Sequence, residues 1–147
     1  MERSLVLLKP DTVQRGLMGQ IIGRIEKKGL KVAGMKMMEV EEGLAKEHYA
    51  EHVDKDFFSD LFGFITSSPI VAMVVEGEQA ISVLRNMMGA TNPFEAEPGT
   101  IRGDFGLDLT KNLIHGSDSP ESAKREIDLF FGSEEILDYE LTVGEWH

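Results

Sequence analysis

The run Ile70-Val71-Ala72-Met73-Val74-Val75 constrains the fold of this 147-residue chain more than any other feature. Every position is apolar and four of the six residues are β-branched, without the polar alternation of a strand that has one face in water. A short continuous apolar run of this kind is typical of a fully buried strand. We therefore expect Ile70–Val75 to be a central strand of a sheet.

Three further segments have the pattern of strands: Ser4–Leu8, the imperfectly alternating Leu30–Val40, and the short Asn112–His115. Apolar residues at helical spacing predict helices over Leu17–Ile25, two patches within Glu41–Ile65, Gln79–Met88, and a helix beginning at Ser119-Pro120. This order predicts an α+β fold (an α/β sandwich) with a ferredoxin-like βαββαβ core, a four-stranded antiparallel sheet and added helices. The length favours a single domain over residues 1–147.

The segment Gly89–Gly106 has little hydrophobic periodicity and contains two prolines, Pro93 and Pro98. It is long for a structureless connection, which indicates either a functional loop or a linker. Both flanks have the pattern of one core, so we expect a functional loop.

The charge balance limits the choice of partners. Fifteen Lys and Arg against 26 Asp and Glu give a formal charge of −11, which disfavours nucleic acid and anionic membranes as partners. Residues 1–38 carry +5 and residues 39–147 carry −16. An anionic substrate must therefore meet a few placed cations, and we expect a small positive pocket on an acidic surface. The absence of cysteine excludes disulfides, thiolate metal sites and a thiol nucleophile.

Several familiar motifs are absent from the sequence. It contains no P-loop, no G-x-G-x-x-G and no G-x-S-x-G, which excludes the nucleotide and hydrolase sites built on them. The opening apolar run Leu5–Leu8 is too short for a signal peptide, and no stretch approaches a membrane span. We expect a cytoplasmic protein.

His115 is the leading candidate for chemistry. It lies at the end of a predicted strand and just before a helix N-terminus, where open α/β sheets often place reactive groups and where anions are favoured. A nucleophilic histidine needs its second nitrogen held by a partner, and Glu126 is placed to do this with Ser117 bridging. The alternative is a structural histidine that caps a loop. His48 and His52, four residues apart, make a weak zinc pair and are expected to be solvated helix residues.

Three polar residues could meet a phosphate: Arg102 in the irregular segment and Arg85 at a helix end could offer guanidinium groups, and Thr91 a hydroxyl. Lys9 stands at the end of an apolar strand, where a lone lysine is unusual unless it reaches a polar site. Ordinary surface salt bridges are the alternative for each charged residue. Phe57 is either a core residue or an exposed ring on which a base could stack.

Six blocks of the sequence together resemble the nucleoside diphosphate kinase family over essentially the whole chain. They are Leu8-Lys9-Pro10-Asp11 with Gln14-Arg15-Gly16, Glu47-His48-Tyr49, Pro69–Val74, Gly89–Pro93, Pro98–Phe105 and Asn112–Ser119. The resemblance implies a kinase (a transferase of nucleotide metabolism) that moves the γ-phosphate of a nucleoside triphosphate such as ATP to a nucleoside diphosphate. It also implies a ping-pong mechanism with broad base tolerance.

The resemblance also implies roles for individual residues. His115 would carry the phosphoryl group, with Glu126 and Ser117 orienting its ring. The other implied positions are Lys9 and Asn112 at the ribose hydroxyls, Arg85, Thr91 and Arg102 at the phosphates, Phe57 against the base, and Tyr49 packed nearby. Mg²⁺ would be carried by the nucleotide phosphates, with Asp118 the nearest protein ligand. A homohexamer is implied, with a homotetramer as the alternative.

Two other function classes compete with this interpretation. Ferredoxin-like sheets also serve as RNA-binding surfaces, but these need exposed aromatic residues on strands and a basic sheet face. The strand Ile70–Val75 has no aromatic residue, and the net charge is −11. A purely structural oligomer with a degenerate site would require the loss of matched residues, and none is lost.

Overall fold

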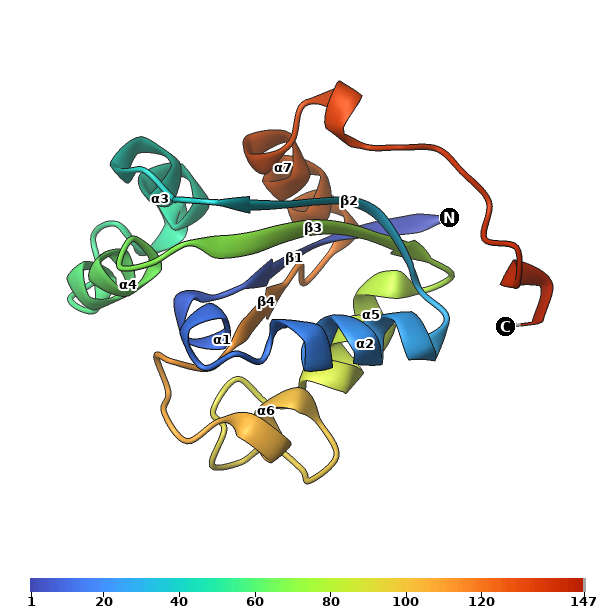
Figure 1. Cartoon of the computed structure of the whole chain (residues 1–147). Helices are drawn as coiled ribbons and strands as arrows, with labels where there is room; N and C mark the ends of the chain where they lie inside the picture. Colours follow the sequence, from blue (N-terminus) through green and yellow to red (C-terminus); the bar gives the residue numbers. More distant parts are fainter. Residues whose placement is uncertain (147) are drawn as a thin grey trace.

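The apolar run at residues 70–75 lies within strand β3 (Ile70–Gly77), every residue of which is buried. In the computed structural model, which describes residues 1–146, β3 lies between two neighbours in a four-stranded antiparallel sheet (Figure 1). The strand order is β2-β3-β1-β4, with β1 at Glu2–Leu8, β2 at Lys31–Met38 and β4 at Ile114–Gly116. The prediction of a central strand is confirmed.

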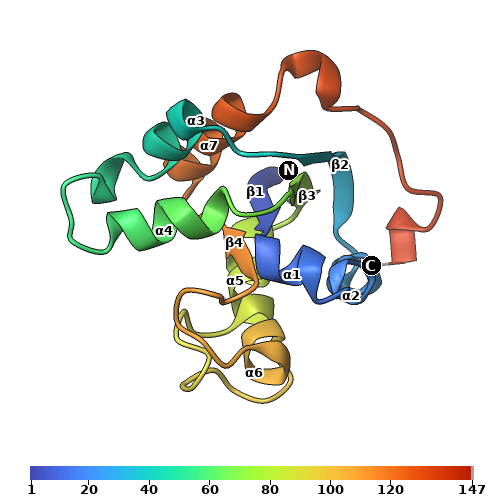
Figure 2. The ribbon, with the colours of Figure 1, turned by 60° about the vertical axis from the view of Figure 1, so that its left-hand side comes forward.

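Helices cover both faces of the sheet (Figure 2). Because side chains alternate along β1, Val6 and Leu8 enter one core and Leu5 and Leu7 the other. The first core includes side chains of α2 (Met18–Lys28) and α5 (Ala80–Met88), and the second those of α3 (Glu42–His48), α4 (Phe58–Ile65) and α7 (Pro120–Phe130). The predicted ferredoxin-like α+β fold with a four-stranded antiparallel sheet and added helices is confirmed.

Two short helices were not expected from the sequence. Strand β1 ends at Leu8, and Pro10, two residues later, occupies the first position of α1 (Pro10–Gln14). Within the segment 89–106, α6 spans Ile101–Phe105, so Arg102 lies on a helix rather than in an irregular loop. Thr100 caps this helix by accepting a hydrogen bond from the Gly103 amide at 3.0 Å.

Two strands depart from their predicted patterns for identifiable reasons. A register irregularity between Val32 and Gly34 interrupts the alternation of β2. Strand β4 begins two residues later than predicted, because Leu113 has a φ of +77° and turns the chain just before it.

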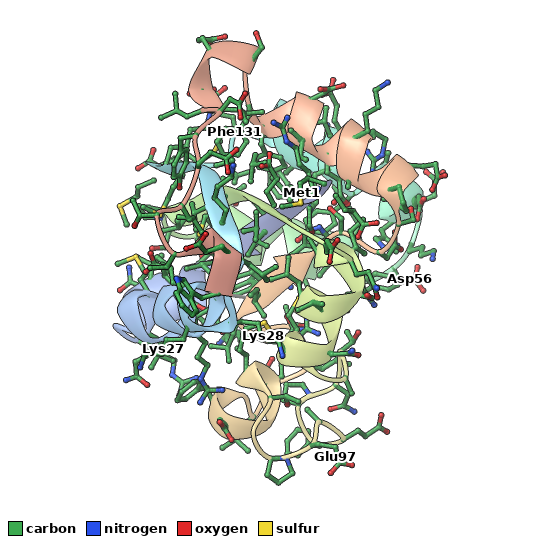
Figure 3. The ribbon with its side chains drawn as sticks, turned by 90° about the vertical axis from the view of Figure 1, so that its right-hand side faces the viewer. Met1, Lys27, Lys28, Asp56, Glu97 and Phe131 are labelled. Carbon is green, nitrogen blue, oxygen red and sulfur yellow. The ribbon has the colours of Figure 1, made fainter. Side chains whose placement is uncertain are left out.

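The chain beyond α7 runs along the outside of β2 (Figure 1). It contains single 3₁₀ turns at Ser133–Glu135 and Gly144–Trp146, and the Leu137 amide donates to the Ala33 carbonyl of β2 at 2.8 Å. Figure 3 shows Lys27 of α2 and Asp56 on opposite sides of the molecule. Across residues 1–146, every helix falls short of the length and hydrophobicity that crossing a bilayer requires.

Candidate active site

A cavity of about 610 Å³ opens where β4, α3, the end of α5 and the start of α7 meet. This volume lies within the usual range for small-ligand sites. Ten of the eleven residues predicted for the site line the cavity: Lys9, Tyr49, Phe57, Arg85, Thr91, Arg102, Asn112, His115, Asp118 and Glu126. The eleventh, Ser117, is fully buried behind the wall.

His115 lies on β4, opposite Leu7 of β1, and its side chain is 25% exposed. Its Nε2 atom lies 3.0 Å from Oε1 of Glu126 on α7. The described residues offer no hydrogen-bond partner to its other nitrogen, Nδ1. One nitrogen is therefore held by a carboxylate while the other remains free on a ring that borders the cavity.

Glu126 is itself fixed by a buried hydroxyl. Ser117 donates to the same Oε1 atom at 2.7 Å and accepts a hydrogen bond from the Leu5 amide at 3.0 Å. The expectation that Ser117 bridges His115 and Glu126 is therefore wrong, since the histidine and the carboxylate are in direct contact. Ser117 supports the carboxylate from behind and ties it to β1.

The charge state of Glu126 sets the tautomer of His115. Burial alone would raise the pKa of Glu126, but the hydrogen bonds from His115 and Ser117 and the adjacent imidazoles bring it below its usual value. An ionised carboxylate only accepts hydrogen bonds, so Nε2 must carry the proton that it donates. The neutral ring then has its lone pair on Nδ1.

His48 occupies a different environment from the one expected. It is the last residue of α3, whereas His52 lies in a separate 3₁₀ turn, so the two do not share one helix. The prediction of a solvated residue is wrong for His48, because its side chain is 7% exposed and packs edge-on against His115 at 4.8 Å between ring centroids. Burial and the neighbouring His115 lower the pKa of His48 well below its usual value, so its ring is neutral.

A hydrogen-bonded turn positions the residues before His115. Leu113 has a φ of +77°, a conformation that side-chain-bearing residues rarely adopt. The Leu113 amide donates to Oδ2 of Asp11 at 3.1 Å, and its carbonyl accepts from the Thr12 hydroxyl at 2.7 Å and the Lys9 amide at 2.8 Å. The start of α1 thus holds the strained residue that turns the chain between Asn112 and β4.

Lys9 and Asn112, which the family resemblance places together at the ribose, form a hydrogen-bonded pair at the pocket wall. The Lys9 ammonium donates to Oδ1 of Asn112 at 2.7 Å, and the Asn112 amide donates to the Thr91 carbonyl at 3.0 Å. Burial and the nearby Arg102 lower the pKa of Lys9 to about 8. Lys9 is therefore charged at neutral pH, but it loses its proton more easily than an exposed lysine.

Arg102, which the sequence placed in an irregular segment, is buried, with 5% of the residue exposed. Its side chain donates to the carbonyls of Asn112 at 3.1 Å, Gly89 at 3.0 Å and Ile114 at 2.5 Å. Three of the five N–H groups of the guanidinium therefore connect α6 to neighbouring backbone, including the segment before His115. The other two N–H groups are left to bind a ligand. Burial and Arg85 lower the pKa of Arg102 to about 10, which leaves it charged at neutral pH.

Four further side chains line the cavity: Arg85, Phe57, Tyr49 and Arg125. Arg85, exposed near the end of α5, reaches the Gly116 carbonyl at 3.4 Å. Phe57 is 47% exposed, which supports the expectation of an accessible ring over that of a core residue. Tyr49 is half-buried, and burial raises its pKa to about 12. Arg125, which the sequence reasoning missed, also lines the cavity, with its guanidinium 4.0 Å from Oε2 of Glu126.

The prediction of a positive pocket is wrong for the net charge of the residues that line it. The lining holds four cations (Lys9, Arg85, Arg102, Arg125) and four carboxylates (Glu51, Asp60, Asp118, Glu126). With the histidines neutral, the formal balance is zero, against −11 for the whole chain. The pocket is thus less acidic than the molecule around it, although its lining is balanced rather than positive.

Gly116 serves packing, in addition to leaving the ring accessible. A Cβ atom at this position would lie 2.7 Å from Sδ of Met88 on α5. The side-chain-free backbone therefore allows β4 to approach α5 closely, which brings Arg85 to the edge of the His115 strand.

Comparison with known proteins assigns the chain to a family. The family model described as Nucleoside diphosphate kinase matches residues 2–136. A Listeria monocytogenes protein named nucleoside diphosphate kinase is 58% identical over 146 residues, covering 99% of both chains. An Archaeoglobus fulgidus protein of the same name is 59% identical over 146 residues, covering 99% of this chain and 97% of its own.

The fold comparison agrees with the sequence comparisons. The structure of a halophilic nucleoside diphosphate kinase from Halobacterium salinarum in complex with CDP superposes with a TM-score of 0.97 at 54% identity, covering 99% of this chain and 97% of that chain. The chain is therefore an enzyme of the phosphotransferase class. It belongs to the nucleoside diphosphate kinase family.

Proposed function

We propose that this protein, acting as one domain, transfers the γ-phosphate of a nucleoside triphosphate to a nucleoside diphosphate through a phosphohistidine at His115. The observation that carries this proposal is the His115 ring, whose Nε2 is held by Glu126 at 3.0 Å. Its Nδ1 lone pair is the free nucleophile at the cavity. Family membership supports the reaction class, and the ring geometry supports the identity of the attacking atom.

The first half-reaction forms a phosphorus–nitrogen bond. The Nδ1 lone pair attacks the γ-phosphorus, and the bond between that phosphorus and the bridging oxygen breaks, leaving its electron pair on the departing diphosphate. The ring becomes positively charged and keeps its Nε2 proton, which Glu126 stabilises. In the second half-reaction, a terminal oxygen of another nucleoside diphosphate attacks the phosphorus, and the electron pair returns to Nδ1.

The cations near His115 suit the positioning and charge stabilisation that phosphoryl transfer requires. We propose that Arg85, the Thr91 hydroxyl and the remaining donors of Arg102 hold the phosphates. Lys9 and Asn112, already paired at 2.7 Å, would hold the ribose hydroxyls. The exposed Phe57 ring would stack on the base, and Tyr49 would support it.

Mg²⁺ fits this pocket as an ion carried by the nucleotide. Mg²⁺ prefers oxygen ligands and is usually held by one or two carboxylates together with substrate phosphates. Among the described residues, the one group of three donors at metal spacing contains two imidazoles, so it is not an oxygen cage. Asp118, exposed at the pocket, is the carboxylate that we propose to assist, and the ion would neutralise phosphate charge during transfer.

The proposed activity is tested by mixing the purified protein with ATP, Mg²⁺ and each of GDP, CDP and UDP. We expect all three triphosphates to form at rates within about tenfold of one another, because stacking contacts a π-face common to every base. Initial rates at varied donor and acceptor concentrations should give the parallel double-reciprocal lines of a ping-pong reaction. Intersecting lines would contradict the covalent intermediate.

Lys9 makes nucleotide binding pH-dependent. Its pKa of about 8 in the free protein should rise when an anionic nucleotide binds, because the negative charge favours the ammonium form. Binding at pH 8–9 should therefore take up protons, and binding at pH 6, where Lys9 is already charged, should not. Calorimetry in buffers of different ionisation enthalpy measures this uptake. It should vanish in Lys9→Met, and a persistent uptake in that variant would exclude Lys9 as its source.

Phe57 should contribute to affinity for every nucleotide. Stacking of a base on an aromatic ring is worth about 1–3 kcal/mol, so Phe57→Ala should raise KM about 5-fold to 150-fold for purine and pyrimidine nucleotides alike. Phe94→Ala, which removes another exposed ring outside the cavity, is the matched control and should leave KM unchanged. Steady-state kinetics on both variants make the comparison.

We also propose that the chain assembles into a homohexamer. What supports this is β2, an edge strand of the sheet, on which Met35 and Met37 are each 56% exposed. Six chains of 16.4 kDa should give about 98 kDa by light scattering. A mass of about 66 kDa would show the homotetramer instead, and a mass near 16 kDa would exclude assembly.

A further inference from the structure

Three residues at the inner wall of the pocket have metal-ligand spacing. His48, His115 and Glu126 each offer one donor atom, and these atoms lie within 4.8 Å of one another. They come from α3, β4 and α7, so the group assembles only when the chain folds. Across residues 1–146, no other group of three His, Asp or Glu side chains meets this spacing.

His48 provides an independent indication of a ligand. Its Nδ1 atom is buried without a hydrogen-bond partner, and its side chain is only 7% exposed. A buried polar atom left unpaired destabilises the folded state, and native proteins rarely contain one without a reason. The ring lines the cavity and lies edge-on to His115. Nothing in the proposed phosphoryl transfer uses this ring.

The donor set selects the kind of metal. Two imidazole nitrogens and one carboxylate oxygen match Zn²⁺, which takes such ligands in three-residue sites that leave a fourth position open. Mg²⁺, by contrast, prefers oxygen ligands alone. We propose that His48, His115 and Glu126 form a binding site for Zn²⁺ or a similar borderline-soft divalent cation, and that the metal-bound form cannot accept a phosphoryl group.

The inhibition follows from the single proton on the neutral His115 ring. Nε2 faces Glu126 at 3.0 Å, so it is the nitrogen that a cation bound to this carboxylate meets. Coordination needs the Nε2 lone pair, and the ring proton must therefore move to Nδ1. A protonated Nδ1 has no lone pair with which to attack phosphorus. This consequence rests on the proposed function, whereas Zn²⁺ binding itself does not.

Zn²⁺ binding is tested without nucleotide, by titrating the full chain against a chromophoric chelator and by recording the visible spectrum with Co²⁺. We expect one ion per chain and Co²⁺ absorption bands typical of a four-coordinate site. His48→Phe keeps a ring in place but removes its nitrogens, and Glu126→Gln removes the carboxylate. Each should weaken binding at least about tenfold, since even residues that only support metal ligands cost about 10–100-fold when changed.

His52→Phe is the matched control for this titration. His52 also lines the pocket and has an unpaired buried Nδ1, but it lies outside the three-residue group. The His52→Phe variant should therefore bind Zn²⁺ with the affinity of the wild type. Unchanged affinity in His48→Phe, lost affinity in His52→Phe, or the absence of stoichiometric binding would each overturn the proposal.

Nitrogen-15 chemical shifts of His115 test the tautomer. Zn²⁺ should move the ring proton from Nε2 to Nδ1, and phosphate uptake from ATP should stop until a chelator removes the metal. A proton that stays on Nε2 with Zn²⁺ bound would overturn the inhibition. If metal-free protein transfers phosphate but does not bind Zn²⁺, only the metal site fails. If it binds Zn²⁺ but never transfers phosphate, only the proposed function fails.

Discussion

His115→Ala is expected to reduce the exchange of phosphate between ATP and GDP by at least about 10⁴-fold. Removing the nucleophile of a covalent mechanism leaves only the positioning and charge effects of the pocket. The loss should appear in kcat, because Lys9, Arg85 and Asn112, which we propose to hold the nucleotide, still line the cavity. Steady-state kinetics and an ADP-binding titration on the same preparation separate the two effects.

His115→Gln distinguishes lost chemistry from lost packing. Glutamine fills much of the space of the imidazole and can donate a hydrogen bond to Glu126, but it has no nucleophilic nitrogen. We expect it to be as inactive as His115→Ala, with a melting temperature closer to that of the wild type. Substantial activity in either variant would show that the phosphoryl group passes elsewhere.

Arg102→Met is expected to lower both activity and stability. The change leaves the carbonyls of Asn112, Gly89 and Ile114 without their donors, at a cost of about 2–4 kcal/mol in the free energy of unfolding. It also removes the donors proposed to reach phosphate, which should lower kcat by roughly 10²–10³. Denaturant titration and steady-state kinetics measure the two losses.

Two companion variants make this result specific. Arg24→Met removes a more exposed arginine that pairs with Asp104 of α6 at 2.6 Å, and it should cost no more than about 1 kcal/mol and leave kcat unchanged. Arg102→Lys keeps the charge but not the planar fork, so it should recover only part of either loss. If Arg24→Met and Arg102→Met behaved alike, the buried fork would have no special role.

The parts of the fold that the sequence predicts are those determined locally. The run Ile70–Val75 predicts a buried strand because it is apolar throughout, too short for a typical helix, and β-branched at four of its six positions. The pair Ser119-Pro120 predicts the start of α7, and the Ser119 hydroxyl indeed accepts a hydrogen bond from the Ser122 amide at 3.1 Å. The missed helix α6 had a signal of the same kind in its Thr100 cap, hidden by the surrounding prolines and glycines.

The features that sequence reasoning missed depend on contacts between distant segments. His48 is buried because α3 packs beside α7 and β4, and only its i, i+4 spacing with Leu44 indicated an inward face. The positive φ of Leu113 is supported by hydrogen bonds with residues about 100 positions earlier: its amide donates to Asp11, and its carbonyl accepts from Thr12. The roles carried over from the family for Lys9, Asn112 and the arginines remain predictions.

The phosphorylated protein itself tests the central claim most directly. After reaction with ATP and removal of nucleotide, phosphorus–nitrogen NMR correlation and peptide mapping should place one acid-labile, alkali-stable phosphate per chain on Nδ1 of His115. Adding GDP or CDP should discharge it to the corresponding triphosphate. The mechanism would be contradicted by phosphate on Nε2 or on another residue. It would also be contradicted by an enzyme that turns over without becoming phosphorylated.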